Sequence, residues 1–257
     1  MRSAERGIAC PGCPHRAAFV AVKQAVGRGR GRVYCGDAGC PVVGAMHPAA
    51  LAVEGGESAL LDRYRQAVPD GSDESRARIC AHFVTDRALA SEAAERELDH
   101  LALEAETVLL CVLASSRSSM TEEAASALVD RAIELGGGDA FVLDPFDTLS
   151  CEQALGELSE RPGVHTVVFA SPCARLGEGD GLEPVEIDPY ACVGCHRCKQ
   201  ITGCPAIVFE PPVYAIDADA CAGCDLCADY CRDHVIYSPR QRMSVEERRE
   251  ARYTRAE

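Results

Sequence analysis

The chain has 257 residues, 16 cysteines, no tryptophan and a formal net charge of −14. This length is sufficient for one sizeable core and a small additional unit. The amino terminus does not resemble a signal peptide, and no apolar run approaches the ~20 residues of a membrane span, which predicts a cytoplasmic protein. An unexported chain this rich in cysteine is expected to bind metal rather than to form disulfides.

Helical and strand patterns alternate along residues 14–173. Helices are expected at residues 17–26, 58–68, 87–104, 121–135 and 150–161, and strands at residues 33–35, 79–84, 107–113, 141–143 and 164–170. The strand at 107–113 is continuously apolar, as a strand buried on both faces should be. Ser150 and Gln153 are placed for a capping box at the start of the last helix. The alternation predicts an α/β fold with a doubly wound, mainly parallel sheet in residues 1–182.

Two runs of four cysteines follow in residues 183–238. The first run contains Cys192, Cys195, Cys198 and Cys204, and the second contains Cys221, Cys224, Cys227 and Cys231. Three cysteines at two-residue intervals can present three thiolates to three iron corners of one cubane, while the fourth ligates the other cluster in two-cluster ferredoxins. The spacing therefore predicts a small ferredoxin domain with two [4Fe-4S] clusters. Cluster A would be held by Cys192, Cys195, Cys198 and Cys231, and cluster B by Cys221, Cys224, Cys227 and Cys204.

Zinc sites or disulfides are the alternatives for these eight cysteines. Zinc seldom uses three cysteines at two-residue intervals in tandem, and disulfides suit a secreted chain. The first run has five residues before its last cysteine, and Arg232 rather than proline follows the second run. Neither departure from the simplest bacterial spacing removes a ligand.

Acidic residues are concentrated around the same cysteines. Residues 183–238 contain nine Asp and Glu against three Lys and Arg, a net charge of −6. This sign opposes binding to nucleic acid and suits docking on a basic patch of a redox partner, although solubility alone would also explain it. Residues 239–257 contain six Arg and four Glu, and are expected to form a charged tail or a frayed surface helix.

Cysteines outside the two runs point to a further site. Cys40 and Cys173 each follow an expected strand and should lie at the carboxyl edge of the sheet, where Cys10 and Cys13 could cover them. From spacing alone these four cysteines could hold iron–sulfur or zinc, or the Cys10–Cys13 pair could be redox-active, and Cys35 could replace Cys40. The remaining cysteines are expected to be buried small hydrophobes: Cys80, Cys111 and Cys151.

Several motifs resemble one family in matching order. The segment Cys10-Pro-Gly-Cys-Pro-His-Arg16 and the segment Gly36-Asp-Ala-Gly-Cys40 resemble the opening of the thiamine-diphosphate domain in the indolepyruvate:ferredoxin oxidoreductase alpha subunit. Residues 112–121 are similar to its asparagine-containing segment, Ser171–Ala174 to its later cysteine motif, and residues 203–207 to its ferredoxin tail. The likeness covers residues 8–238 of a chain shorter than the family subunit, which carries a further thiamine-binding domain. It implies a third [4Fe-4S] cluster held by Cys10, Cys13, Cys40 and Cys173.

The thiamine and Mg²⁺ positions of that family are altered here. Its Gly-Asp motif matches Thr85-Asp86, its asparagine matches Ser115, and the companion aspartate matches Ala114. A hard cation needs oxygen ligands, and glycine lets the backbone approach the diphosphate, so the resemblance implies a degenerate site at Asp86 and Ser115 unless the motif is misplaced by a few residues. His15, beside the third set of cysteines, is expected either to donate to a sulfur, to act as an acid, or to lie on the surface.

Three functions follow as hypotheses. The first is an iron–sulfur electron-transfer protein or subunit of a larger redox complex in an anaerobic cytoplasm, with no catalytic residue assigned. The second is a working thiamine-dependent 2-oxoacid:ferredoxin oxidoreductase subunit that needs partner chains, in which the cofactor would supply the carbanion chemistry. The third is a sensor or scaffold that uses its clusters structurally.

Overall fold

A computed structural model of the chain describes residues 9–27, 31–36, 77–89, 99, 102, 105–135, 138–176 and 182–256. Some predictions therefore lie outside the described residues. These are the helix at 58–68, most of the loop at 36–40, and most of the helix at 87–104.

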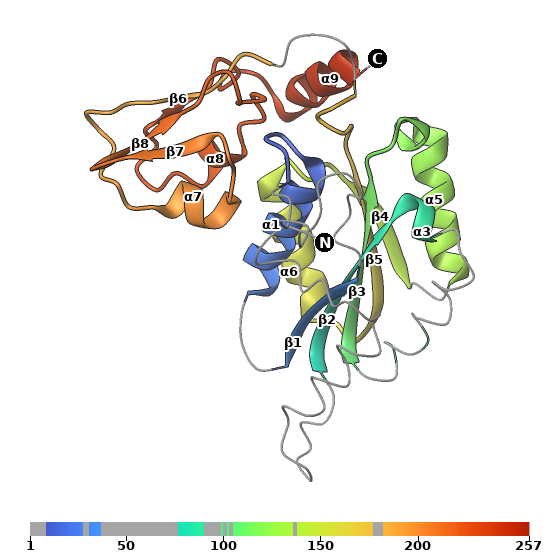
Figure 1. Ribbon diagram of the computed structural model, residues 1–257. Helices are drawn as coiled ribbons and strands as arrows, with labels where there is room; N and C mark the ends of the chain where they lie inside the picture. The colour runs from blue at the N-terminus through green and yellow to red at the C-terminus, as the bar shows by residue number, and fades with distance from the viewer. Residues whose placement is uncertain are drawn as a thin grey trace, which may run out of the picture.

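A five-stranded parallel sheet forms the larger part of the molecule (Figure 1). Its strands are β1 (Arg32–Gly36), β2 (Ala77–Thr85), β3 (Ala105–Ala114), β4 (Asp139–Leu143) and β5 (Gly163–Ala170), in the order β1-β2-β3-β5-β4. Every neighbouring pair is parallel. The expected doubly wound, parallel α/β fold is confirmed.

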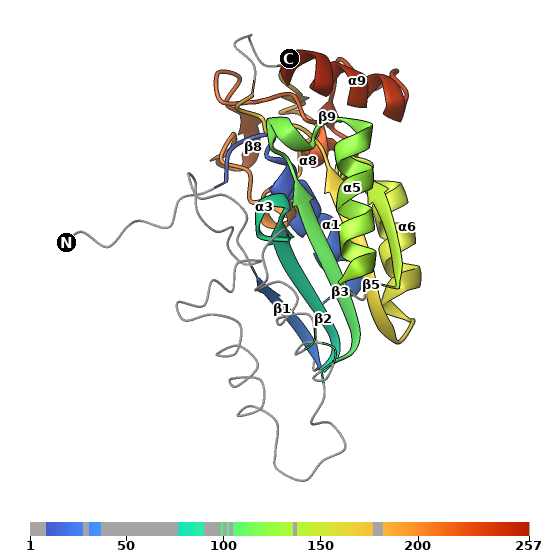
Figure 2. The same ribbon diagram turned by 90° about the vertical axis from the view of Figure 1, so that its right-hand side faces the viewer.

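Helices cover both faces of this sheet (Figures 1 and 2). Helices α1 (Pro14–Val26) and α6 (Thr148–Ser159) lie on one face, and α3 (Asp86–Leu89) and α5 (Glu122–Glu134) lie on the other. The central strand β3 is apolar from residue 108 onward because its side chains enter both cores, with Leu109 and Leu113 on the α1 face and Leu110 on the α5 face.

The α6 helix begins differently from the expected capping box. Asp147 is the N-cap residue, and its Oδ1 accepts a hydrogen bond from the backbone N–H of Ser150 at 3.1 Å. Ser150 is therefore already inside the first turn, and its predicted capping role is wrong. Asp147 caps the helix because a carboxylate accepts from the free N–H groups of the first turn as well as a hydroxyl does.

The carboxyl-terminal unit, residues 182–238, contains short elements separated by the cysteine loops. Strands β6 (Glu186–Ile187) and β9 (Ile236–Tyr237) pair antiparallel, as do β7 (Ile207–Glu210) and β8 (Val213–Ile216). Helices α7 (Arg197–Thr202) and α8 (Leu226–Asp229) complete the unit. It packs against the outer side of α1, where Ala17 and Val20 contact a buried cluster that includes Leu226 and Tyr230.

The last segment forms a helix, which is one of the two expected alternatives. Helix α9 (Val245–Ala256) returns to the α/β domain, as Figure 1 shows. Arg252 is 8% exposed, forms an ion pair with Asp144, and lies 4.7 Å from the centroid of the Phe146 ring. Arg255 donates to the carbonyl oxygen of Ala174 at 3.1 Å. These arginines have partners far away in the sequence, and the partners hold the helix against the α/β domain.

One glycine of the cysteine loops is required by its surroundings. Gly223 has a φ of +65°, and a β-carbon there would lie 2.6 Å from the carbonyl oxygens of Leu182 and Glu183. We expect Gly223→Ala to lower the free energy of unfolding by about 1–3 kcal/mol, since it adds both left-handed strain and a clash.

Gly156 provides the matched control for this substitution. It lies inside α6, and a β-carbon there would meet nothing within 4 Å. Gly156→Ala should raise the free energy of unfolding by about 0.5–1 kcal/mol, because alanine is the better helix former. Denaturant unfolding of both variants tests the pair, and equal effects would contradict the argument.

Candidate metal centres

Two cavities in the carboxyl-terminal unit are each lined by four cysteines. Cavity A is lined by Cys192, Cys195, Cys198 and Cys231. Cavity B is lined by Cys204, Cys221, Cys224 and Cys227. Each set combines three cysteines from one run with the fourth cysteine of the other run. The structure thus brings together the same two sets that the sequence spacing predicts.

The two loops that carry these cysteines repeat one backbone conformation. Gly194 and Gly223 have φ values of 63° and 65°, and His196 and Asp225 have φ values of 63° and 65°. A short helix begins directly after each loop, α7 after His196 and α8 after Asp225. These left-handed residues turn the backbone tightly, so that three cysteines at two-residue intervals face one cavity.

Backbone N–H groups point at several of the sulfurs in these cavities. The Cys221 sulfur accepts from Gly223 N–H at 3.5 Å, and the Cys231 sulfur accepts from Val235 N–H at 3.4 Å. Backbone N–H groups also stabilise the thiolates of Cys198, Cys204 and Cys224. These hydrogen bonds favour the ionised form of sulfur, which is the form that binds metal.

Cysteines outside the cavities show the opposite bonding. Cys111 donates to the carbonyl oxygen of Leu109 at 3.5 Å, and Cys151 donates to that of Asp144 at 3.3 Å. Both side chains, and that of Cys80, are fully buried. A sulfur that donates a proton is a thiol, so these residues are the buried small hydrophobes that the sequence predicted.

Burial makes several of the cavity cysteines hard to ionise without a metal. It raises the pKa of Cys227 well above its ordinary value, and it raises the pKa of Cys198 and Cys204 despite the backbone N–H groups. Metal ligands must lose their protons. A cation at these positions would therefore compensate for the burial cost that now favours the thiol.

A buried ion pair holds the second loop in place. Asp225, between two cavity B cysteines, accepts from Arg240 Nη2 at 2.9 Å and Nε at 3.1 Å, and from the Ser238 hydroxyl at 2.7 Å. Both charged side chains are 7% exposed. The bidentate geometry fixes the loop to the segment after β9, and therefore fixes the positions of its cysteines.

Three of the four cysteines predicted for a third site are described, and they lie where the sheet ends. Cys13 is the N-cap of α1, and the nearby backbone N–H groups of Arg16 and His15 act to lower the pKa of its thiol. Burial nevertheless raises the pKa of Cys13 to about 11, and nearby Cys173 contributes in the same direction. Cys10 accepts from Cys13 N–H through its carbonyl oxygen at 3.2 Å. Cys40 lies outside the described residues.

Cys35 does not replace Cys40 in this arrangement. Its sulfur lies 3.4 Å from the Cys80 sulfur and 3.4 Å from Nδ1 of His82. These side chains belong to the core on the α5 face, whereas Cys13 belongs to the core on the α1 face. The sheet therefore separates Cys35 from the third set of cysteines.

The two predicted thiamine positions lie close together but are already bonded within the chain. Oδ1 of Asp86 accepts from Arg87 N–H at 2.9 Å, and Oδ2 accepts from the Ser116 hydroxyl at 2.5 Å. The Ser115 hydroxyl forms a 2.7 Å hydrogen bond with Nε2 of His15. Among the described residues, both side chains are therefore held by hydrogen bonds within the chain, which disfavours their use as Mg²⁺ ligands.

His15 is buried and does not have the surface role that was one of its expected alternatives. It is 7% exposed, and burial lowers its pKa to about 4, which leaves the imidazole neutral near pH 7. Its Nδ1 is buried without a hydrogen-bond partner. An orphaned polar atom beside Cys13 indicates that a further polar group belongs at this site.

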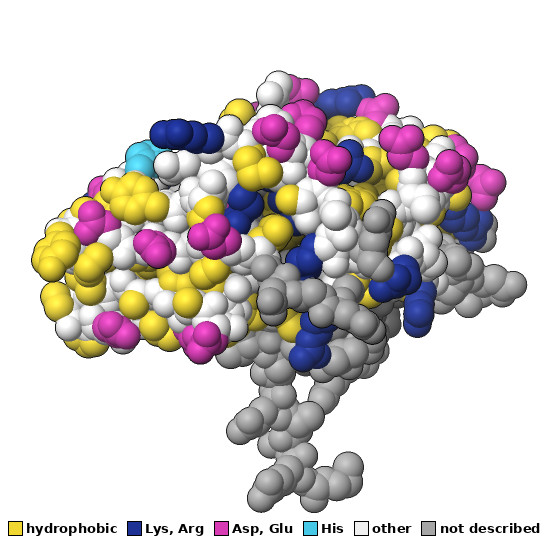
Figure 3. All heavy atoms as spheres, turned by 90° about the horizontal axis from the view of Figure 1, so that it is seen from above, with side chains coloured by type: hydrophobic (Ala, Val, Ile, Leu, Met, Phe, Trp, Pro, Cys, Tyr) yellow, Lys and Arg dark blue, Asp and Glu magenta, His cyan; other side chains and the backbone are white. Residues whose placement is uncertain are grey.

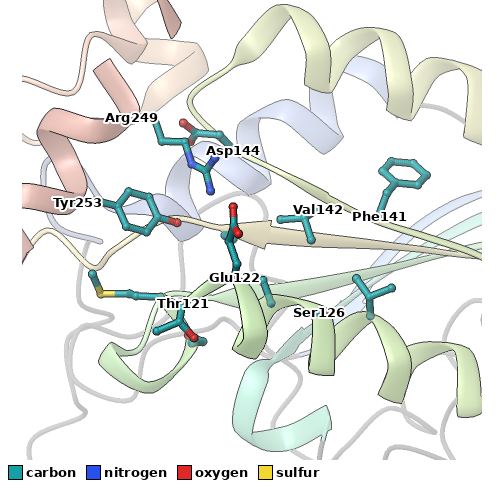
Figure 4. A pocket seen from close by; sticks show the side chains of 13 residues that line it. Thr121, Glu122, Ser126, Phe141, Val142, Asp144, Arg249 and Tyr253 are labelled. Atoms are coloured by element: carbon teal, nitrogen blue, oxygen red, sulfur yellow. The ribbon is translucent and has the colours of Figure 1, made fainter. Parts of the chain in front are cut away.

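A larger cavity of about 430 Å³ opens where α5, β4, β5 and α9 meet (Figure 4). Arg249 and Tyr253 extend from α9 toward Glu122 at the start of α5. Its lining includes neither Asp86 nor Ser115. This cavity is therefore separate from the altered thiamine positions.

The described residues contain neither a single-ion metal site nor a membrane-spanning helix. No group of three or more His, Cys, Asp or Glu side chains within them is arranged to hold a single metal ion. A cubane differs from a single ion in this respect, because its thiolates bind separate iron corners instead of converging on one point. Among the same residues, no helix has the length and apolarity needed to span a bilayer.

The fold and these cysteine sets define an α/β protein with candidate metal centres, and its sequence relatives are oxidoreductase subunits. The chain is similar to the indolepyruvate oxidoreductase subunit IorA of Archaeoglobus fulgidus, with 25% identity over 255 residues, 89% of this chain and 39% of the relative. It is also 25% identical to the same subunit from Thermococcus kodakarensis over 255 residues, and from Pyrococcus abyssi over 256 residues, in each case 86% of this chain and 39% of the relative.

The chain thus spans 39% of the length of these relatives. The predicted resemblance to the indolepyruvate:ferredoxin oxidoreductase alpha subunit is confirmed. No protein-family model and no solved structure matches the chain.

Proposed function

We propose that this chain is an iron–sulfur electron-transfer protein that holds three [4Fe-4S] clusters and relays single electrons between them. The observation that carries the proposal is the pair of cavities, each lined by three cysteines of one run and the fourth of the other. When bound, each cluster supplies one-electron chemistry at a potential set by net charge, hydrogen bonds to sulfur, and exposure. Clusters A and B occupy cavities A and B.

The chain supplies what such clusters need from a protein. Apolar side chains such as Val185 and Ile207 line cavity B, and Tyr214 and Ile236 line cavity A. These walls exclude water, and the backbone N–H groups described above offset the negative charge on sulfur. The two together favour bound clusters over free thiols.

The third cluster lies beside Cys10, Cys13 and Cys173, with Cys40 as its fourth ligand. Close packing with cavity B supports this part of the relay. A β-carbon on Gly12 would lie 2.7 Å from the Cβ of Ala222 and 3.8 Å from that of Cys224. It would lie 3.4 Å from the Cβ of Ala174, which follows Cys173. The order of transfer is then third cluster, cluster B, cluster A, in either direction.

Electrons enter or leave through cluster A. Cys195 is exposed, and the neighbouring Val193 is 64% exposed. Figure 3 shows hydrophobic and acidic side chains interspersed over this end of the molecule. A surface on which apolar and acidic side chains are interspersed suits a redox partner with a basic patch. The relatives are named as subunits, which supports a partner protein or a larger oxidoreductase complex.

The alternative function is a thiamine-dependent 2-oxoacid oxidoreductase subunit, and a single assay separates it from the relay. Indolepyruvate, thiamine diphosphate and Mg²⁺ are added to the anaerobic protein while the visible absorbance of its clusters is followed. We expect no reduction, because both oxygens of Asp86 and the Ser115 hydroxyl are bonded within the chain. Dithionite is the positive control. If indolepyruvate bleaches the cluster absorbance and thiamine diphosphate is bound, the electron-relay proposal is rejected in favour of the enzyme subunit.

A further inference from the structure

Among the residues that the structure describes, Arg16 is a buried cation without a carboxylate partner. It is 1% exposed. Its Nη1 donates to the carbonyl oxygen of Thr202 at 2.6 Å, its Nε donates to that of Cys10 at 3.3 Å, and its Nη2 donates to that of Ala9. All of its partners are neutral carbonyl groups. A buried charge is costly unless an opposite charge compensates it.

The position of this side chain suggests where that opposite charge lies. On one side, Arg16 bonds the segment that carries Cys10 and Cys13, and on the other it bonds Thr202, two residues before Cys204. It also lines cavity B. The guanidinium of Arg16 therefore lies between the segment that carries Cys10 and Cys13 and the cysteines of cavity B.

We infer that Arg16 is an electrostatic bridge between the third site and cavity B, whose charge is compensated by the anionic clusters on its two sides. This inference rests on the proposed function. A [4Fe-4S] cluster with four thiolates is net negative and becomes more negative on reduction. A shared cation therefore stabilises the reduced form of both clusters and raises both reduction potentials.

Lys199 is the matched control because it serves only one of the two sites. Its Nζ donates to the carbonyl oxygens of Cys204 and Ile207, each at 2.8 Å. Among the described residues, its side chain has no hydrogen bond to the segment that carries Cys10 and Cys13, which Arg16 does bond. Lys199→Gln should therefore lower the potential of the cavity B cluster and leave that of the third-site cluster unchanged.

The test is an EPR-monitored redox titration of the anaerobic, cluster-loaded full chain, with signals assigned through Cys13→Ser and Cys227→Ser variants. Arg16→Gln and Arg16→Met should lower the potentials of both the third-site and cavity B clusters. Each of these two reduction potentials should fall by at least about 59 mV, which is a tenfold change in a one-electron equilibrium. The reduction potential of the cavity A cluster should not change. Arg16→Lys keeps the positive charge, so both reduction potentials should shift by less than about 59 mV from the wild-type values. Two neutral variants are used so that the comparison does not depend on one side chain being accommodated.

Three results would overturn the role of Arg16 as a bridge. The reduction potentials could stay unchanged in the neutral variants, the cavity A cluster could shift as much as the other two, or Arg16→Lys could shift the potentials as much as the neutral variants do. The proposed function fails in a different way, through a wild-type protein that lacks iron at cavity B or at the third site. Iron content and thermal unfolding are measured on every variant. Full iron with unmoved potentials therefore rejects the role of Arg16 alone.

Discussion

Replacing Cys227 by serine is expected to remove one cluster, about four irons per chain, and to lower the thermal unfolding midpoint of the carboxyl-terminal unit. Cys227 is 8% exposed and lines cavity B at the start of α8. A serine hydroxyl is a poor substitute for a thiolate, and the empty cavity would leave buried sulfurs without the metal that offsets their burial. Iron, inorganic sulfide and circular dichroism on heating measure the effect.

Cys111→Ser is the control for this experiment. Cys111 is fully buried in β3, but its sulfur donates to a carbonyl oxygen and lines neither cavity. The same atomic change there should leave the iron content at its wild-type value. Equal iron loss in both variants would show that Cys227→Ser acts through general destabilisation. Full iron content in Cys227→Ser would show that Cys227 is not a cluster ligand.

Breaking the Asp225–Arg240 pair is expected to produce the largest loss of stability. Within the part of the chain that the structure describes, Arg240→Gln leaves the buried Asp225 carboxylate with the Ser238 hydroxyl as its one remaining side-chain partner. Removing one partner of a buried ion pair typically costs about 3–5 kcal/mol. Denaturant unfolding of the anaerobic protein measures this cost, and iron content shows whether the cysteine loop keeps its shape.

Two further variants make this prediction specific. Asp225→Asn combined with Arg240→Gln removes both charges, and asparagine tolerates the φ of +65° at this position, so the double variant should lose less stability than Arg240→Gln alone. Arg232→Gln breaks an ion pair with Asp233 in which the arginine side chain is 60% exposed. That change should leave the unfolding midpoint essentially unchanged. Equal losses for Arg232→Gln and Arg240→Gln would contradict the role of burial.

The sequence was informative where the relevant pattern is local. The apolar run at 107–113 predicted a strand buried on both faces, and β3 has that environment because parallel strands are covered on both sides. The two-residue cysteine intervals predicted the grouping in cavities A and B, because three residues of one loop are already positioned together. The fourth member of each set followed from the known exchange between tandem loops.

Features that depend on distant partners could not be predicted in this way. Arg252 occurs in a polar, arginine-rich segment that is typical of a solvated tail, and only its contacts with Asp144 and Phe146 explain why α9 is ordered. His15 lies beside cysteines in the sequence, but its burial depends on the loop after β3, where Ser115 meets it. Asp147 and Ser150 are both acceptable caps, and the turn after β4 decides between them.

Anomalous X-ray scattering at the iron edge, from crystals of the anaerobic protein, tests the three-cluster account most directly. We expect three iron peaks. One should lie among the four cysteines of cavity A, one among those of cavity B, and one beside Cys10, Cys13 and Cys173 with Cys40 as the fourth ligand. A zinc-edge signal beside Cys13 would remove the third cluster, and the absence of iron from cavities A and B would contradict the account as a whole.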